Sequence, residues 1–332
     1  MNLQHRIDLL VQLGDYILTG NPEWLASKEK AGYENGWFIP AFLEIATQNV
    51  ALSFLQKEKL ENLADSYKLP SINPKPKTVG IIMAGNIPLV GFHDFLCVFI
   101  SGHKSLIKPS SKDQVLIKHL IEKLTQWDAE IKNLVEFSEM LKGCDAYIAT
   151  GSNNSSRYFD YYFGKYPSII RRNRTSIALL SGKESREDLE RLADDVYLYF
   201  GLGCRNVTKI YLPSNYGFVP LLEAFKKYNH LADHHKYKNN YDYNLALHLL
   251  NKKYYMTNGS ILLIEEPGIF SPISQLNYEF YNSNDELTLK LPAAQELQCF
   301  VGKSFVPFGQ SQSPLIRDYA DGVDTLKFLK GL

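Results

Sequence analysis

Residues 78–110 read TVGIIMAGNIPLVGFHDFLCVFISGHKSLIKPS and indicate the fold class. The apolar run at 79–83 predicts a short buried strand, which ends in the turn Ala84-Gly85-Asn86. The segment from about 88 to 101 then predicts a helix, and residues 105–108 predict a second strand. A strand, a helix and a strand in this order are typical of a βαβ unit in a parallel sheet.

The same alternation continues along the chain. It predicts helices at about 113–127, with Asp113 as the N-cap, and at 154–163, 186–199 and 219–228. It predicts strands at 134–137, 146–149, 176–180 and 207–212. Residues 1 to about 65 differ, because their apolar positions recur at helical spacing only. A length of 332 residues suits two domains. The sequence therefore predicts an α/β protein with two Rossmann-like parallel-sheet domains and a helical N-terminal lead-in.

Composition excludes several classes of protein. Lys and Arg total 36 and Asp and Glu total 36, which leaves no bulk attraction to nucleic acid or anionic lipid. Four cysteines without a CxxC pair exclude a disulfide scaffold and a zinc ribbon. The longest apolar stretch, 89–100, is interrupted by His93 and Asp94 and is too short to span a bilayer. The N-terminus lacks a signal-peptide pattern, so a cytoplasmic protein is expected.

Two glycine-bearing turns and one lysine lie at the carboxyl ends of predicted strands. AGNIP (84–88) and Thr150-Gly151-Ser152 each occur where a strand meets a helix N-terminus, a place where anionic cofactors bind. Lys108, followed by Pro109 and Ser110, ends the next strand and can reach ribose or phosphate oxygens. Taken singly, each feature also suits an ordinary tight turn or a solvated strand end.

Cys204 differs from the other three cysteines in its surroundings. Cys97, Cys144 and Cys299 lie in apolar or mixed segments that are typical of packing residues. Cys204 follows Gly-Leu-Gly at the exit of a predicted helix and precedes Arg205. Glycines let the backbone approach a substrate closely, and a nearby cation favours the thiolate. A nucleophile is the sharper interpretation, and a buried turn cysteine is the alternative.

The remaining polar clusters carry weaker signals. His234 and His235 lack the spacing of a metal site, so no bound metal is expected. His93 suits a core position better than a catalytic one. The run RRNR (171–174) is typical of a solvated face, with phosphate binding as the alternative. The Tyr-, Asn- and Lys-rich stretch 234–243 is expected to form a surface excursion.

A series of motifs resembles the aldehyde dehydrogenase superfamily. In chain order they are GN-x-P (85–88), KPS (108–110), ATGS (149–152), the Gly-Cys turn and PFG (307–309). The closing segments VPFGQ (306–310) and DYADGVDT (318–325) resemble more closely the LuxC-type acyl-CoA reductases, the fatty acid reductases of bacterial bioluminescence and their relatives. The likeness covers roughly residues 78–330.

The resemblance implies roles for particular residues. Cys204 falls at the place of the nucleophile. Asn86 falls at that of the oxyanion-hole amide, which acts together with the backbone N–H of the cysteine. Lys108 and Ser110 fall at the contact with the adenosine ribose. The turn beside the cofactor phosphates corresponds to Thr150, Gly151 and Ser152. Phe308 and Gly309 fall on a loop that closes the active site.

The same resemblance divides the chain. Residues 1–175 are expected to hold the N-terminal helices and a nicotinamide cofactor-binding domain. Residues 176–310 are expected to form the catalytic domain that carries the nucleophilic cysteine. Residues 311–332 are expected to pack back on the body as a C-terminal segment.

Two departures from the superfamily pattern bear on the chemistry. Oxidising members carry Glu-Leu-Gly-Gly upstream of the cysteine, and its Glu activates the hydrolytic water. The matching stretch IRRNRTS (170–176) holds no carboxylate. Glu265 and Glu266 match the acids of a Glu-Glu-Ile-Phe-Gly-Pro motif, but IFSP (269–272) follows only after a two-residue gap, which leaves a ribose-binding role of Glu266 open.

The resemblance therefore implies reduction of a fatty acyl-CoA, or of another acyl thioester, to a fatty aldehyde through a cysteine acyl-enzyme. Ser111 stands where an acid would bind the adenosine 2′-hydroxyl, so NADPH is preferred over NADH. An NAD(P)-dependent aldehyde dehydrogenase working in the oxidising direction and a non-catalytic acyl-binding subunit of a reductase complex are the alternatives. The donor is acyl-CoA or an acyl-protein, and a homo-oligomer or an acyl-transferring protein partner stays open.

Overall fold

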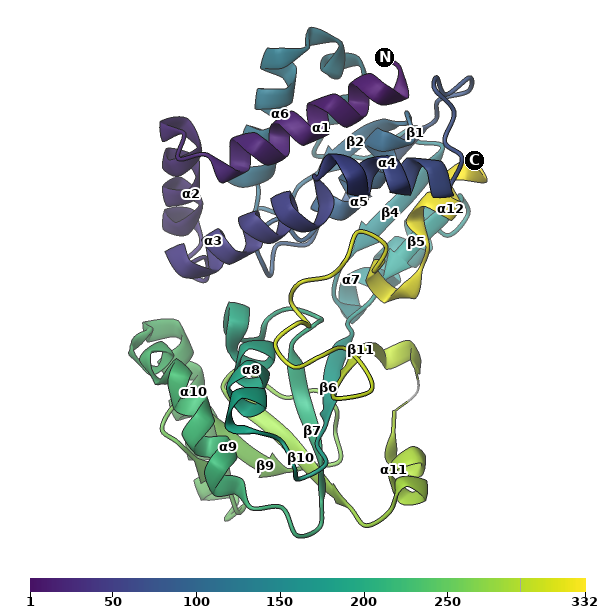
Figure 1. The fold of residues 1–332 in the computed structure, drawn as a ribbon. Coiled ribbons are helices and arrows are strands. Elements are labelled where there is room, and N and C mark those ends of the chain that lie inside the picture. The colour runs from purple at the N-terminus through teal and green to yellow at the C-terminus, as the bar shows by residue number, and fades with distance from the viewer. Residues whose placement is uncertain (293) are drawn as a thin grey trace. The chain divides into compact units, whose positions relative to one another are not determined.

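The computed structural model describes residues 1–292 and 294–332. These residues form two compact units, one of Met1–Asn173 with Pro314–Leu332 and the other of Arg174–Ser313. Each unit is built on its own sheet, and the ribbon of Figure 1 shows the helices that accompany each. The α/β architecture and the helical N-terminus expected from the sequence are confirmed.

Helices occupy the chain ahead of the first strand. They are α1 (Leu3–Leu18), α2 (Pro22–Glu34), α3 (Pro40–Asn49), the π-helical segment η1 (Val50–Phe54) and α4 (Lys57–Ser66). Asn2 and Asn21 cap the first two helices, because their side-chain oxygens accept backbone N–H groups of the first turn. The apolar stripe of α1, with Leu10 and Leu13 fully buried, faces the core of the first unit.

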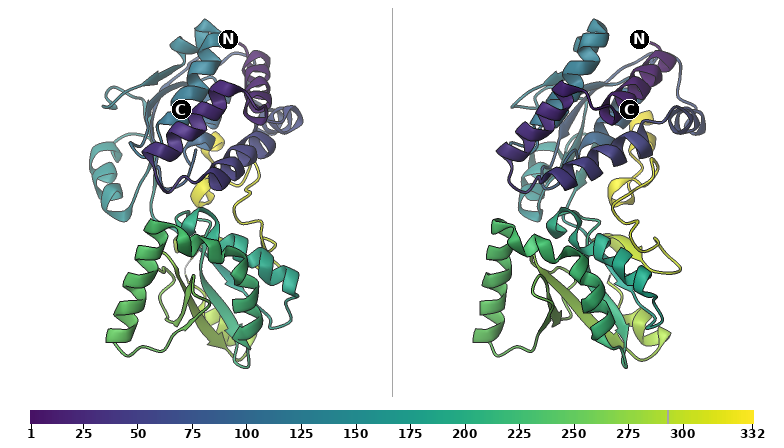
Figure 2. Two further views of the ribbon diagram at one scale, coloured as in Figure 1. Left: turned by 90° about the vertical axis from the view of Figure 1, so that its left-hand side faces the viewer. Right: turned by 60° about the vertical axis from the view of Figure 1, so that its left-hand side comes forward.

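The first sheet has the strand order β3-β2-β1-β4-β5, and its neighbouring strands are parallel. Its elements are β1 (Thr78–Ile82), α5 (Phe92–Ile100), β2 (Lys104–Lys108), α6 (Val115–Trp127), η2 (Ala129–Asn133), β3 (Val135–Phe137), β4 (Ala146–Thr150), α7 (Asn153–Phe163) and β5 (Ser168–Arg171). Right-handed crossovers place α5 and α6 on one face of this sheet and α7 on the other. The N-terminal helices pack on the α5–α6 face (Figure 2).

Arg171 corrects the expectation of a solvated face at 171–174. Its guanidinium is buried, forms an ion pair with Asp94 of α5 and donates from Nη2 to Thr325 Oγ1 at 3.0 Å. Successive side chains of a strand point to opposite faces, so the last residue of β5 points inward with Ile169. Arg172, outside the strand, is exposed. Because charged residues follow one another in this part of the sequence, the alternation of buried and exposed side chains could not be recognised there.

The second sheet has the order β11-β6-β7-β10-β9-β8 and is parallel except at β8, which runs antiparallel to β9. Its elements are β6 (Thr175–Leu179), α8 (Arg186–Tyr197), η3 (Leu198–Gly201), β7 (Val207–Pro213), α9 (Phe218–Phe225), η4 (Lys226–Asp233), α10 (His235–Leu250), β8 (Met256–Thr257), β9 (Leu262–Glu265), β10 (Gln275–Tyr281), α11 (Asn284–Lys290), η5 (Ala294–Glu296) and β11 (Leu297–Val301). Helices α8 and α9 pack together, and α11 lies across the sheet from them (Figure 1).

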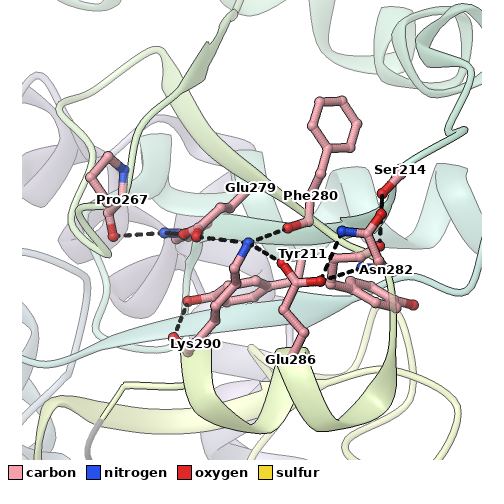
Figure 3. A network of polar contacts seen from close by, with 10 residues as sticks. Tyr211, Ser214, Pro267, Glu279, Phe280, Asn282, Glu286 and Lys290 are labelled. Atoms are coloured by element: carbon pink, nitrogen blue, oxygen red, sulfur yellow. Dashed lines mark hydrogen bonds and ion pairs between the residues drawn. The ribbon is translucent and has the colours of Figure 1, made fainter.

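A charged network joins α11 to the strands of this sheet (Figure 3). Lys209 of β7 is fully buried and donates to Glu279 of β10 at 2.7 Å and to the carbonyl of Pro267 at 2.6 Å. Lys290, at the end of α11, forms ion pairs with Glu279 and with Glu286. Every buried charge of the network therefore has a partner, as a stable interior requires.

The stretch 234–243 is not a surface excursion. It forms the start of α10, in which Tyr237, Tyr241 and Asn244 are buried at intervals of four and three residues. This spacing is helical, but two tyrosines and an asparagine do not register as an apolar stripe in the sequence. His234 caps the helix by accepting the N–H of Tyr237.

The C-terminal segment belongs to the first unit. After Ser313 the chain continues through η6 (Ala320–Gly322) to α12 (Thr325–Lys330), which packs against α5. Leu326 and Leu329 are buried there, and His103 Nε2 donates to the carbonyl of Leu329 at 3.1 Å.

Candidate active site

The carboxyl edge of the first sheet gathers most of the residues expected to contact a cofactor. Strand register pairs Ile82 of β1 with Lys108 of β2 and with Ala149 of β4. Lys108 therefore lies level with the last residue of β1, and Thr150 lies one residue beyond that level at the same edge of the sheet. This is the edge at which open parallel sheets bind ligands.

Close packing and a hydrogen bond hold the loop that carries Asn86. A Cβ on Gly85 would come within 2.5 Å of Ser110 Oγ, so only glycine lets the ends of β1 and β2 approach this closely. Asp113 Oδ2 accepts the N–H of Leu89 at 2.7 Å, and burial raises the pKa of Asp113 to about 7. Asp113 therefore braces the Asn86 loop instead of capping α6, the role that the sequence suggested.

The turn Thr150-Gly151-Ser152 leads directly into the N-terminus of α7. Ser152 Oγ accepts the N–H of Ser155 and caps the helix. A Cβ on Gly151 would lie 2.8 Å from the ring of Phe159, so this glycine lets the helix pack close to the strand end. The N–H of Gly151 donates to the carbonyl of Arg171 at 3.4 Å, so it is the dipole at the start of α7 that favours a bound anion.

A hollow of about 490 Å³ opens beside this edge within the first unit. Lys108 lines it and donates from Nζ to the carbonyl of Glu139 at 2.8 Å. Its wall includes the cations Lys142 and Lys165 and the rings of Tyr147, Tyr162 and Tyr166. Three lysines and several aromatic faces fit a ligand that combines a flat ring with phosphate.

Cys204 lies in a strained turn of the second unit. Between α8 and the cysteine, Tyr199, Phe200 and Gly201 all adopt positive φ, at 55°, 57° and 75°. Left-handed conformations at two consecutive aromatic residues cost free energy and persist only where packing enforces them, and both rings are buried. The Cys204 side chain itself is half-buried.

Two further residues hold the peptide groups around Cys204. Asn206 is completely buried; its Oδ1 accepts the N–H of Gly203 at 2.8 Å, and its Nδ2 donates to the carbonyl of Leu198 at 2.9 Å. Ser176 Oγ donates to the carbonyl of Cys204 at 3.1 Å and lies 3.0 Å from Cys299 Sγ. Neither residue was predicted from the sequence, in which the only signal for Asn206 is its place near the cysteine.

The loop that contains Phe308 is anchored to α8. Phe308 is buried, and Gly309 has φ +81°, a conformation that favours glycine. The carboxylate of Asp195 accepts the N–H groups of Gly309 and Ser311 at 2.7 and 2.9 Å. Asp195 could not be predicted from the sequence either, because these two partners lie more than a hundred positions away.

His93 and Glu266, two further residues considered from the sequence, have structural partners. His93 Nε2 donates to the carbonyl of Ile316 at 2.8 Å, between the rings of Phe54 and Tyr319. Glu266 forms an ion pair with Lys253, which lowers the pKa of the carboxylate. Across residues 1–292 and 294–332, no group of His, Cys, Asp and Glu side chains is arranged to hold a metal ion. Nor does any helix in these ranges have the length and apolar character to cross a membrane.

One family model matches the chain, and solved structures share its fold. The family model for acyl-CoA reductases of the LuxC type matches residues 56–220, about half of the chain. No curated protein matches the chain in sequence. Among solved structures, an aldehyde dehydrogenase from Physcomitrella patens, in complex with the reaction product succinate, has a TM-score of 0.66 at 11% identity over 91% of this chain and 74% of its own.

Two cofactor complexes have the same fold. An aldehyde dehydrogenase from Mycobacterium tuberculosis, complexed with NAD+, has a TM-score of 0.65 at 11% identity over 91% of this chain and 73% of its own. The NAD+ complex of an aldehyde dehydrogenase from Bacillus cereus has a TM-score of 0.63 at 13% identity over 91% and 72%. At these identities the likeness shows the fold that the two sheets already indicate.

Proposed function

The chain belongs to the LuxC-type acyl-CoA reductases, NAD(P)-dependent oxidoreductases of the aldehyde dehydrogenase superfamily, and from this we propose that it reduces a fatty acyl thioester to a fatty aldehyde with NADPH. The observation that carries the proposal is the rigid, glycine-bounded turn of Cys204 in a chain of this family. Aldehyde-group redox chemistry follows from the family. The thioester substrate, the choice of NADPH and the acyl-cysteine are the proposal.

The first half-reaction forms a covalent intermediate. The thiolate of Cys204 attacks the acyl carbonyl, and the C–S bond to CoA breaks with departure of the CoA thiolate. The Cys204 N–H and the amide of Asn86 are proposed to stabilise the oxyanion, and one such donor lowers the barrier by about 3 kcal/mol. Asn206 and Ser176 support this step, since they fix the peptides on either side of the cysteine.

The second half-reaction releases the aldehyde. When bound, NADPH would supply the hydride that reduces the acyl carbonyl. Collapse of the resulting tetrahedral carbon breaks the bond to sulfur, which frees the aldehyde and returns Cys204 to the thiolate. The stretch 170–176 offers no carboxylate to activate water, and Arg171 within it is engaged by Asp94. Both observations support a thioester that survives until reduction.

The carboxyl edge of the first sheet fits the cofactor. Ser110 lies against Gly85, where the ends of β1 and β2 come close together. Thr150, Gly151 and Ser152 lead into the N-terminus of α7, whose dipole favours an anion. Lys108 lines the neighbouring hollow, where the adenosine half would lie. Phe308 is proposed to contact the cofactor from its anchored loop. Lys142 and Lys165 in the hollow, together with an uncharged residue, Ser111, shortly after Lys108 in the sequence, favour the 2′-phosphate of NADPH.

Two rival functions make different predictions. An oxidising aldehyde dehydrogenase would convert aldehyde and NAD(P)+ to acid, which the missing base disfavours. A non-catalytic acyl-binding subunit would accept an acyl group on Cys204 without consuming reduced cofactor.

The deciding experiment follows the absorbance of NADPH with a panel of acyl-CoAs. Wild type is compared with Cys204→Ala and with Cys144→Ala, a control at a buried cysteine whose pKa burial raises. Oxidation that yields aldehyde, needs Cys204 and survives Cys144→Ala supports the proposal. Acyl label on Cys204 without turnover would favour the subunit or an acyl-protein donor, and no label with any thioester would reject the mechanism.

A further inference from the structure

Asp195, in the last turn of α8, contacts two segments that are far apart in the sequence. Its side chain is fully buried, and its carboxylate accepts the N–H groups of Gly309 and Ser311. Its own backbone carbonyl accepts Asn206 Nδ2 at 3.1 Å. Since Asn206 holds the turn before Cys204, one residue connects the Phe308 loop to the proposed nucleophile's turn within the second unit.

Only an ionised carboxylate satisfies this arrangement. Each of its oxygens accepts one backbone N–H, and the hydroxyl of Ser311 lies beside the carboxylate as a further donor. An asparagine offers one oxygen, and a protonated carboxyl turns one of its oxygens into a donor. The negative charge of Asp195 therefore decides whether both N–H groups are satisfied.

We propose that Asp195 is a positioning residue, which holds the loop 307–311 and the Cys204 turn in one arrangement as long as its carboxylate is charged. This rests on the proposed function insofar as it concerns turnover. Loss of the charge releases the N–H groups of Gly309 and Ser311, frees the loop and slows the chemistry at Cys204. The loop motif that the sequence singled out thus acts through a residue on another element.

The surroundings of Asp195 place its charge change in an accessible range of pH. Burial raises the pKa of Asp195 to about 6, and the neighbouring Asp194 adds to the rise. From η4, Lys227 and Tyr228 both contact Asp194 at 2.6 Å. From α8 itself, Arg191 lies against Gly309 and pairs with Glu187. The loop is therefore held above about pH 6 and released below it.

The first test is hydrogen exchange of a peptide spanning 306–313, corrected for the intrinsic pH dependence of exchange. In wild type, protection at Gly309 and Ser311 should fall as the pH drops through about 6. In Asp195→Asn it should be low at every pH. In Asp194→Asn the transition should persist and move to lower pH, because a neighbouring charge is gone. If protection at Gly309 and Ser311 in wild type does not change with pH, the proposal is overturned. This comparison uses wild type alone, so it does not depend on the folding of a variant.

The second test is kinetic. Asp195→Asn should lower kcat for acyl-CoA reduction about tenfold at neutral pH and abolish the acidic limb near pH 6, while Asp194→Asn keeps the limb. An unchanged profile in Asp195→Asn overturns the positioning role, as does a uniform loss that retains the limb. If wild type reduces no thioester, the proposed function fails separately. The rate of Cys204 alkylation by iodoacetamide at one neutral pH then decides: a several-fold change in Asp195→Asn supports the coupling, and equal rates reject it.

Discussion

At the scale of single residues, buried carboxyl groups govern how this chain responds to pH. Burial raises the pKa of Asp113 from 3.8 to about 7, while its Oδ2 accepts the N–H of Leu89. A carboxyl whose pKa is higher in the folded state binds its proton more tightly there. Asp113 therefore contributes stability below about pH 4, and this contribution is lost as the pH rises through 7, by about 4 kcal/mol at most.

The variant Asp113→Asn tests this assignment. Its amide oxygen can keep the hydrogen bond to Leu89, and it has no charge to bury at pH 8. We expect the free energy of unfolding in urea to fall between pH 5 and 8 in wild type, and this fall to be smaller in the variant by roughly 2 kcal/mol or more. Parallel pH profiles for the two proteins would show that Asp113 does not carry the titration.

Individual residues differed in how far the sequence revealed them. Cys204 is flanked by glycines and a cation, which are local signals, and it could be singled out. Asp195 and Asn206 could not be, because their importance depends on partners brought together by folding. Arg171 was misread for the opposite reason, since its charged neighbours in sequence are not its neighbours in space.

At the scale of elements, α10 shows what a helix of tyrosines gains from burial. Tyr237 is buried and donates from its hydroxyl to the carbonyl of Ser260 at 2.9 Å, whereas Tyr243 on the same helix is 65% exposed. Tyr237→Phe leaves a buried carbonyl without this donor, which should lower the free energy of unfolding by about 1–3 kcal/mol. Tyr243→Phe is the matched control and should change it by less than about 0.5 kcal/mol. Equal effects in chemical denaturation would contradict the placement of this helix.

Strands β1–β4, β6 and β7 and the helices from α5 to α9 could be predicted, because apolar runs of strand length alternate there with segments at helical spacing. Strands β5 and β8–β11 were not predicted. The segment 234–243 could not, since the side chains that it buries are polar at one end. Helix starts shifted where a tertiary bond competed with a local one: Asp113 binds Leu89, and α6 begins at Val115 without its cap.

At the scale of the whole molecule, the sequence indicated two parallel sheets, and the structure adds their strand order. The order β3-β2-β1-β4-β5 depends on which strands pair, and a local pattern carries no such information. The same holds for the C-terminal segment, which returns to the first unit after the second is complete. Its contacts with α5 and with the turn that follows α5 join residues more than two hundred positions apart, as His103 of that turn and Leu329 illustrate.

Because the C-terminal segment packs on the first unit, a destabilising substitution in this segment should act on that unit. Leu326 and Leu329 of α12 are 0% and 1% exposed, so each change to alanine should cost about 2–5 kcal/mol through lost burial and a cavity. Lys327→Ala, at an exposed position between them, is the control and should cost little. Because α12 packs on α5, hydrogen exchange in Leu326→Ala should accelerate at α5 while β7 of the second unit keeps its protection. Equal acceleration at α5 and β7 would mean that the two units unfold together, and that the segment stabilises the chain as a whole.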